Sequence, residues 1–123
     1  MYELSSKRTV ASFEASDFVP SPGEPGLTWH NVSFDEETGH GSYLMIFEPG
    51  ATSRAHRHDG PEEWYMVEGD LVDSDGFEYH AGDFISLAGG SAHESTSPSG
   101  CKIVVTHRGK FASVSPDELE GAS

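Results

Sequence analysis

The sequence has 123 residues, enough for one domain with a single core, and it carries 7 basic against 21 acidic side chains, a formal net charge of -14. So acidic a surface repels phosphate backbones and anionic lipid headgroups, which argues against nucleic-acid and membrane partners. Cys101 is the only cysteine, so no intrachain disulfide can form. The amino terminus lacks the apolar core of a signal peptide, and the longest apolar run, Tyr43 to Phe47, is too short to cross a membrane, so we expect a cytoplasmic protein.

The first half of the chain predicts two strands behind an irregular start. Residues 1–20 are expected to form an arm or an edge strand, and the proline- and glycine-rich run over 20–26 is expected to be a loop. Strands are predicted over 27–34 and 41–47, the second of them apolar enough to be buried on both faces.

From Thr52 onward, short apolar runs recur every eight to twelve residues, separated by turn-forming mixtures of Gly, Asp, Ser and Pro. One of these predicted turns is Glu68-Gly69-Asp70. This rhythm predicts an all-β sandwich or barrel with little helix. The expected strands cover residues 54–58, 62–67, 71–73, 77–80, 83–87, 93–96 and 102–108.

Helix signals are nearly absent. Only Ser115 to Leu119 combines a capping serine, a first-turn proline and early acids, which predicts a single turn. We expect residues 111–123 to be a tail whose last four residues, 120–123, fray.

The stretch from Gly50 to Gly69 has a spacing suited to metal chemistry. His56 and His58 are two residues apart, so in a strand both imidazoles point to one face, about 7 Å apart. The same alternation places Arg54 beside them and Ala55 on the opposite face. Turn residues follow His58, so the chain folds back and returns with carboxylates beside the two imidazoles.

Two carboxylates on the returning strand, Glu62 and Glu63, compete to be the oxygen ligand. Strand alternation puts Glu62 on the inner face with Trp64 and Met66, and Glu63 on the outer face, so Glu62 is the expected ligand. Arg54 could bind an anionic group of a substrate, and a solvated arginine is the alternative. Trp64 and Met66 are expected to line the cavity or the core.

These residues resemble the two motifs of the cupin superfamily. The first motif is matched by Gly50, His56, His58, Glu62 and Gly69, and the second by Gly82, Gly90 and His93. Ala88 and Ser97 depart from the usual proline and asparagine of the second motif, but no ligand position is lost. Segments such as Pro25-Gly26-Leu27 and Asp75-Gly76-Phe77 further resemble the ChrR-like branch, named for the cupin half of a zinc-binding anti-sigma factor.

The resemblance covers residues 24–110 and implies a double-stranded β-helix, or jelly-roll barrel, forming one domain over 1–123. It implies that His56, His58, Glu62 and His93 hold one divalent transition metal, whether iron, manganese, nickel or zinc. Homodimers paired through a strand edge are common among similar cupins, so a homodimer is expected.

Three imidazoles and one carboxylate leave open positions on an ion that takes five or six ligands, where water, dioxygen or a substrate oxygen can bind. We therefore favour a metal-dependent enzyme acting on a small organic molecule: a dioxygenase that cleaves a C–C bond, or else a lyase or isomerase. The substrate-side candidates are Arg54, Trp64 and Met66, and no catalytic acid or base is assigned. The ChrR resemblance implies a zinc-binding sensor as the alternative, and a barrel merely stapled by its metal is a third hypothesis.

The remaining titratable residues receive structural roles. Cys101 opens an apolar strand and is expected to be a buried, unreactive thiol. The histidines outside both motifs, His30, His40, His80 and His107, are expected to be structural or exposed. Three tyrosines of the predicted strands, Tyr43, Tyr65 and Tyr79, are expected to pack rather than act as acids.

Overall fold

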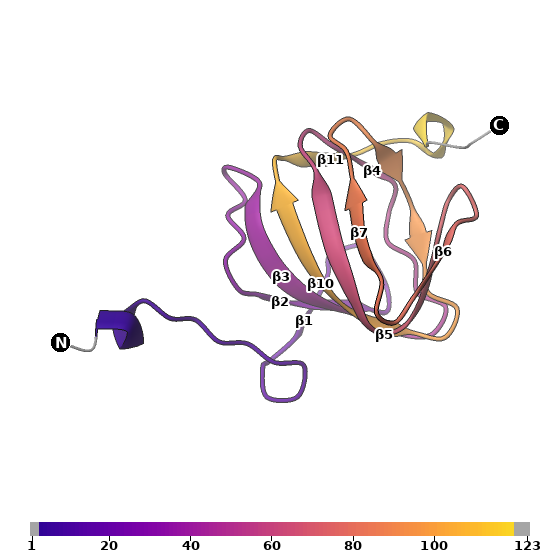
Figure 1. Ribbon diagram of the computed structural model, residues 1–123. Helices are drawn as coiled ribbons and strands as arrows, with labels where there is room; N and C mark the ends of the chain where they lie inside the picture. The colour runs from indigo at the N-terminus through magenta and orange to yellow at the C-terminus, as the bar shows by residue number, and fades with distance from the viewer. Residues whose placement is uncertain (1–2, 120–123) are drawn as a thin grey trace.

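The computed structural model describes residues 3–119 and is almost entirely β (Figure 1). Eleven strands lie between two short 3₁₀ helices in this part of the chain. In chain order the elements are η1 (Glu3–Ser6), β1 (Val19–Pro20), β2 (Leu27–Asn31), β3 (His40–Phe47), β4 (His56–His58), β5 (Glu62–Asp73), β6 (Glu78–His80), β7 (Phe84–Leu87), β8 (Ala92–His93), β9 (Ser95–Thr96), β10 (Cys101–Arg108), β11 (Phe111–Ser113) and η2 (Pro116–Glu118). None of the helices described over residues 3–119 is long and apolar enough to cross a membrane.

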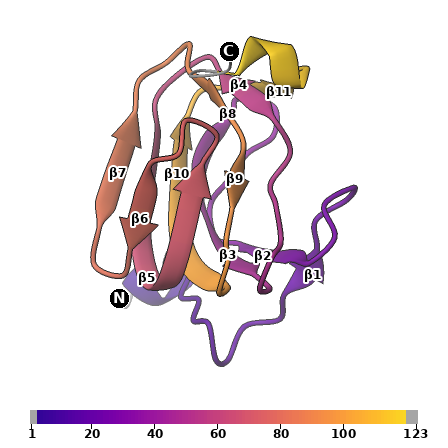
Figure 2. The ribbon, with the colours of Figure 1, turned by 90° about the vertical axis from the view of Figure 1, so that its right-hand side faces the viewer.

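Two antiparallel sheets curve around a common interior (Figures 1 and 2). The larger sheet has the order β1-β2-β3-β10-β5-β6, and β7 and β9 also pair with β5. The smaller sheet, β11-β4-β8, lies at one end of the barrel. Residues 3–16 extend away from the barrel (Figure 1). The expectation of an all-β jelly-roll barrel is therefore confirmed.

The core follows the strand alternation that the sequence predicts. Along β5, Glu62, Trp64 and Met66 are buried, whereas the exposure of Tyr65 and Val67 is 43% and 41%. Alternate residues of β10 are buried as well, so the two strands present one continuous inner wall. Around this wall the buried cluster consists of Leu27, Tyr43, Phe47, Ala51, Trp64, Met66, Leu71, Tyr79, Cys101, Ile103 and Val105.

The predicted turn at Glu68-Gly69-Asp70 is wrong, because β5 runs through these residues without ending. Gly69 has a φ of 85°, and the pairing of β10 with β5 shifts register between Lys102 and Ile103. These are the features of a β-bulge, which needs the same glycine chemistry as a turn but lets the strand continue. The strands expected over 62–67 and 71–73 are thus one.

The ends of the chain also differ from the expectation. Residues 111–113, expected in a tail, form β11 and pair with β4. The strand predicted over 27–34 stops at Asn31, whose amide donates to the Phe34 carbonyl while its oxygen accepts from the Phe34 N–H. The predicted turn of helix is confirmed as η2, with the Glu118 carboxylate accepting the Ser115 N–H at 3.0 Å. The predicted fraying of 120–123 lies outside the described residues.

Candidate metal centre

Four side chains from three strands converge at one end of the barrel interior. His56 and His58 stand on β4, Glu62 opens β5, and His93 ends β8. The pairing of β4 with β8 places His56 directly opposite His93. One ligand atom from each of the four residues lies within 4.8 Å of the others. The structure thus brings together the whole set that the sequence singled out.

One oxygen of Glu62 lies at the centre of this group. Glu62 Oε1 is 3.0 Å from Nε2 of His58 and 3.0 Å from Nε2 of His93, and it is 4.0 Å from Nε2 of His56. The carboxylate therefore faces three imidazole nitrogens, each through the same ring atom. Three nitrogen donors and one oxygen donor make a set that suits iron, manganese, nickel or zinc.

Two of the imidazoles are oriented by hydrogen bonds from their other ring nitrogen. Nδ1 of His56 lies 2.7 Å from the Arg54 carbonyl, and Nδ1 of His93 lies 2.8 Å from Asp73 Oδ1. Both partners are acceptors, so each Nδ1 carries the hydrogen and donates it. The Nε2 lone pair of each ring is then free to bind a metal, an arrangement found around most metal-ligating histidines.

The buried His58 side chain also favours a bound metal ion, because of the partners that its ring lacks. Its side chain is 1% exposed, its Nδ1 has no hydrogen-bond partner among the described residues, and its Nε2 faces the Glu62 carboxylate at 3.0 Å. A buried polar group without a partner costs free energy, and the exceptions in native structures call for an explanation. A cation lying between Nε2 of His58 and the Glu62 carboxylate would satisfy both groups, so the residues present fit a metal ion.

The electrostatics of the group favour a cation as well. Burial by itself raises the pKa of Glu62, but the surrounding imidazoles outweigh it and hold that pKa well below its usual value, so the carboxylate is ionised. Burial lowers the pKa of His93, but Asp73 and Glu62 raise it to about 9. A cation at Nε2 of His93 would take the place of that proton.

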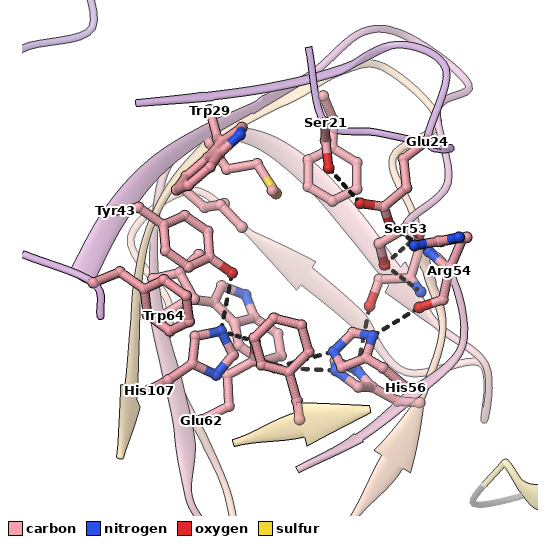
Figure 3. A pocket seen from close by; sticks show the side chains of 18 of the residues that line it. Ser21, Glu24, Trp29, Tyr43, Ser53, Arg54, His56, Glu62, Trp64 and His107 are labelled. Carbon is pink, nitrogen blue, oxygen red and sulfur yellow. Dashed lines mark hydrogen bonds and ion pairs between the residues drawn. The ribbon is translucent and has the colours of Figure 1, made fainter. Parts of the chain in front are cut away.

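The donor group opens into a cavity of about 350 Å³ (Figure 3). His56, Glu62 and His93 line it, together with Trp64. Most of the remaining wall is apolar and comes from Trp29, Phe34, Met45, Phe47, Leu71, Ile103, Val105 and Phe111. A pocket of this size with a few convergent polar groups is typical of a small-molecule site.

The three predicted substrate residues lie in different places. Trp64 lines the cavity, whereas Met66 is fully buried in the core cluster and is not part of the cavity wall. Arg54 lies at the cavity's edge with an exposed side chain, and its backbone N–H donates to Glu24 Oε2 at 2.6 Å. The expected alternation is wrong here, because β4 begins only at His56, and Ala55 is buried instead of facing outward.

Sequence reasoning missed the part of His107 in the site. This histidine was expected to be structural or exposed, but its side chain is 1% exposed and lines the cavity. Its Nε2 atom lies 3.2 Å from Glu62 Oε2 and 2.9 Å from the Tyr43 hydroxyl. Strand alternation could have found it, because Cys101, Ile103, Val105 and His107 share one face of β10.

Phe111 was missed for a related reason. It lies in the expected tail, yet its ring stacks on His107 with 4.8 Å between ring centroids and contacts His56 at 5.6 Å. It therefore covers the donor group from the side of β11. A short, mostly exposed strand has no alternation strong enough to mark it in the sequence.

Comparison with solved structures shows the same fold in proteins of low sequence identity. An acetylacetone dioxygenase from Acinetobacter johnsonii is 19% identical with a TM-score of 0.78, and the match covers 94% of this chain and 84% of the other. The polyketide cyclase RemF from Streptomyces resistomycificus is 21% identical with a TM-score of 0.69, covering 92% and 91%. No curated protein sequence matches the chain.

A third structure connects the fold to ChrR. A chain in the complex of Rhodobacter sphaeroides SigE with the anti-sigma ChrR is 17% identical with a TM-score of 0.66, and the match covers 78% of this chain and 50% of that one. The family described as the ChrR cupin-like domain matches residues 6–112. Because this match takes in most of the sequence, the protein belongs to the ChrR cupin-like domain family.

Proposed function

We propose that the protein is a metal-dependent cupin enzyme acting on a small organic substrate, and that its reaction is oxygen-dependent cleavage of a C–C bond. One observation carries the proposal: three of the four donor residues, His56, Glu62 and His93, line the cavity. A structural ion is closed off by its protein ligands, whereas a catalytic ion keeps a position open to substrate. A donor set that faces a cavity is suited to the second role.

The substrate class follows from the wall of the cavity. The interior is mostly apolar and aromatic, and the charged side chains of Glu24, Glu36 and Arg54 also line the cavity. We propose a small enolisable diketone, whose two oxygens can face polar groups while its short carbon arms contact the apolar wall. The likeness to an acetylacetone dioxygenase supports this choice.

The residues of the chain have separate tasks in such a reaction. His56, His58, Glu62 and His93 would hold an iron, manganese or nickel ion, which supplies redox chemistry with oxygen, whereas zinc would act only as a Lewis acid. Trp64 and Phe111 shield the donor group from water. Arg54 is the positive side chain at the edge of the cavity and is proposed to orient the polar end of the substrate.

The experiment is elemental analysis of protein purified without added metal, followed by oxygen-electrode measurements with acetylacetone. We expect near one iron, manganese or nickel per chain and oxygen uptake that stops when the diketone is consumed. The matched control is His93→Ala, which should lose metal and oxygen uptake together. Full metal occupancy with no oxygen uptake for acetylacetone or related diketones would contradict the proposed reaction.

A second candidate is a zinc-binding regulatory cupin. It is favoured by the ChrR family match and by the likeness to a chain of the SigE–ChrR complex. On this hypothesis the purified protein contains near one zinc and shows no oxygen uptake, and removing the zinc changes its association with a partner. The same elemental analysis therefore separates the two functions.

A further inference from the structure

A hydrogen-bonded pair, Tyr43 and His107, lies beside the metal centre without belonging to it. The two residues stand on the neighbouring strands β3 and β10, and both line the cavity (Figure 3). The Tyr43 hydroxyl and His107 Nε2 are 2.9 Å apart. His107 Nε2 also lies 3.2 Å from Glu62 Oε2, the carboxylate oxygen that does not face the three ligand histidines.

The position of Glu62 decides which way this pair is hydrogen-bonded. Glu62 Oε2 belongs to an ionised carboxylate and can only accept. If His107 Nε2 had no hydrogen, two sets of lone pairs would face each other in a buried site, so Nε2 must carry the hydrogen. The remaining ring nitrogen, Nδ1, is then an acceptor without a partner among the described residues, a smaller cost than an unpaired N–H.

This arrangement leaves the hydrogen of the Tyr43 hydroxyl unused. Because His107 Nε2–H is the donor of the pair, the hydroxyl oxygen accepts and its own O–H points elsewhere. The structure gives this hydroxyl no hydrogen-bond partner other than His107 in the described part of the chain. The tyrosine ring is also fixed, since Trp29 and Phe34 each contact it edge-on with 5.6 Å between centroids.

We propose that the Tyr43 hydroxyl donates a hydrogen bond to an oxygen atom of the substrate, a carbonyl or enolate oxygen, and that His107 is the positioning residue that directs it. This rests on the proposed function, since it assumes that the cavity takes a small oxygen-bearing molecule. A rigid donor in an apolar wall prefers a ligand with an oxygen at that place, because an analogue without it leaves the hydroxyl unpaired.

The test is an anaerobic titration of the purified metal-containing protein with acetylacetone, in which isothermal titration calorimetry measures the Kd. Tyr43→Phe removes only the hydroxyl, so we expect the Kd to rise about tenfold, while metal content stays at the parent value and Tm falls by only the few degrees that one lost hydrogen bond costs. Tyr65→Phe is the matched control, because Tyr65 lies on the outer face of β5, and its Kd should equal that of the parent. A Tyr43→Phe Kd within twofold of the parent value overturns the assignment.

The positioning role of His107 is tested by two further variants. His107→Gln keeps an N–H donor at a similar distance, whereas His107→Phe keeps the ring but removes the donor. We expect His107→Gln to retain most of the affinity for acetylacetone and His107→Phe to lose as much as Tyr43→Phe. Equal losses in both variants, at unchanged metal content, overturn the positioning role.

The outcome for the parent protein keeps this inference distinct from the proposed function. If the parent binds acetylacetone and Tyr43→Phe binds it equally well, the diketone function stands and the Tyr43 assignment falls. If the metal-containing parent binds neither acetylacetone nor related diketones, both fall together.

Discussion

Nδ1 of His93 donates a hydrogen bond to Oδ1 of Asp73 at 2.8 Å, which fixes the imidazole with its other nitrogen toward Glu62. Asp73 is held in turn by the Tyr79 hydroxyl at 2.5 Å and by the Ser95 hydroxyl. Asp73 lies at the far end of β5 from Glu62, so one strand supplies both a candidate ligand and the group that orients another, His93. The candidate metal centre is therefore built into the framework of the sheet.

Asp73→Asn should weaken metal binding although Asp73 is not a ligand. The amide is a poorer acceptor than the carboxylate, and loss of such an orienting partner typically costs 10- to 100-fold in metal affinity. Competition with a chelator measures the change. Asp75→Asn is the control, because Asp75 lies in an exposed turn, where its carboxylate accepts the Phe77 N–H and does not contact the imidazoles of the described site. Equal affinities for the two variants would show that Asp73 does not orient His93.

Glu62→Gln should weaken metal binding far more than Glu63→Gln. Glu62 is 6% exposed and faces the imidazoles, whereas Glu63 points outward and pairs with Arg108 at 3.3 Å. The two substitutions are chemically identical, so any difference in metal binding between the two variants comes from the inward position of residue 62. Metal content after dialysis is the measurement. A larger loss of metal in Glu63→Gln than in Glu62→Gln would show that the ligand is Glu63, on the outer face of β5.

Much of the site could be predicted because it depends on local alternation within strands. His56, His58 and Glu62 are close in sequence, and a turn between two strands is enough to bring them together. His93 required a second motif, which the resemblance supplied. The inward side of β5, which strand alternation alone predicts, agrees with the structure.

The errors come from features that local sequence does not encode. A glycine at φ 85° serves a turn and a bulge equally well, so Gly69 could not be assigned without its partner strand. Arg54 lies before the start of β4, outside the strand alternation, and its backbone N–H donates instead to the carboxylate of Glu24, thirty residues earlier. His107 was overlooked because it lies outside both motifs, although its place on β10 faces the cavity.

Removing the metal should lower the thermal stability of the protein. Metal binds the folded donor set and not the dispersed ligands of the unfolded chain, so free metal at about 100 times its Kd stabilises the fold by roughly 2.7 kcal/mol. For a domain of this size that corresponds to a fall in Tm of about 10 °C on chelation. Calorimetry with and without chelator checks this, and His93→Ala should show no change on chelation.

Cys101 should react slowly with thiol reagents until the protein unfolds. Burial raises the pKa of its thiol to about 11, so at pH 8 the thiolate is about two hundredfold scarcer than for a free cysteine with a pKa of about 8.5. The raised pKa stabilises the fold below about pH 8.5, and this contribution is lost as the pH rises toward 11. The rate of thiol labelling with and without denaturant measures the protection of Cys101, since this is the only cysteine. Fast labelling of the folded protein would contradict the burial.

The bulge in β5 can be tested with two glycines of similar φ. Gly69 has a φ of 85° and Gly76 one of 89°, so alanine suffers the same left-handed strain of about 1–2 kcal/mol at either position. At Gly69, however, a Cβ would lie 2.0 Å from the Gly100 carbonyl oxygen, whereas at Gly76 nothing lies within 4 Å. Gly69→Ala should therefore lower the free energy of unfolding by several kcal/mol more than Gly76→Ala, as measured by urea denaturation, because the backbone of two paired strands must separate. Equal losses would mean that this close approach is absent and that the chain turns at Gly69 instead of continuing through it.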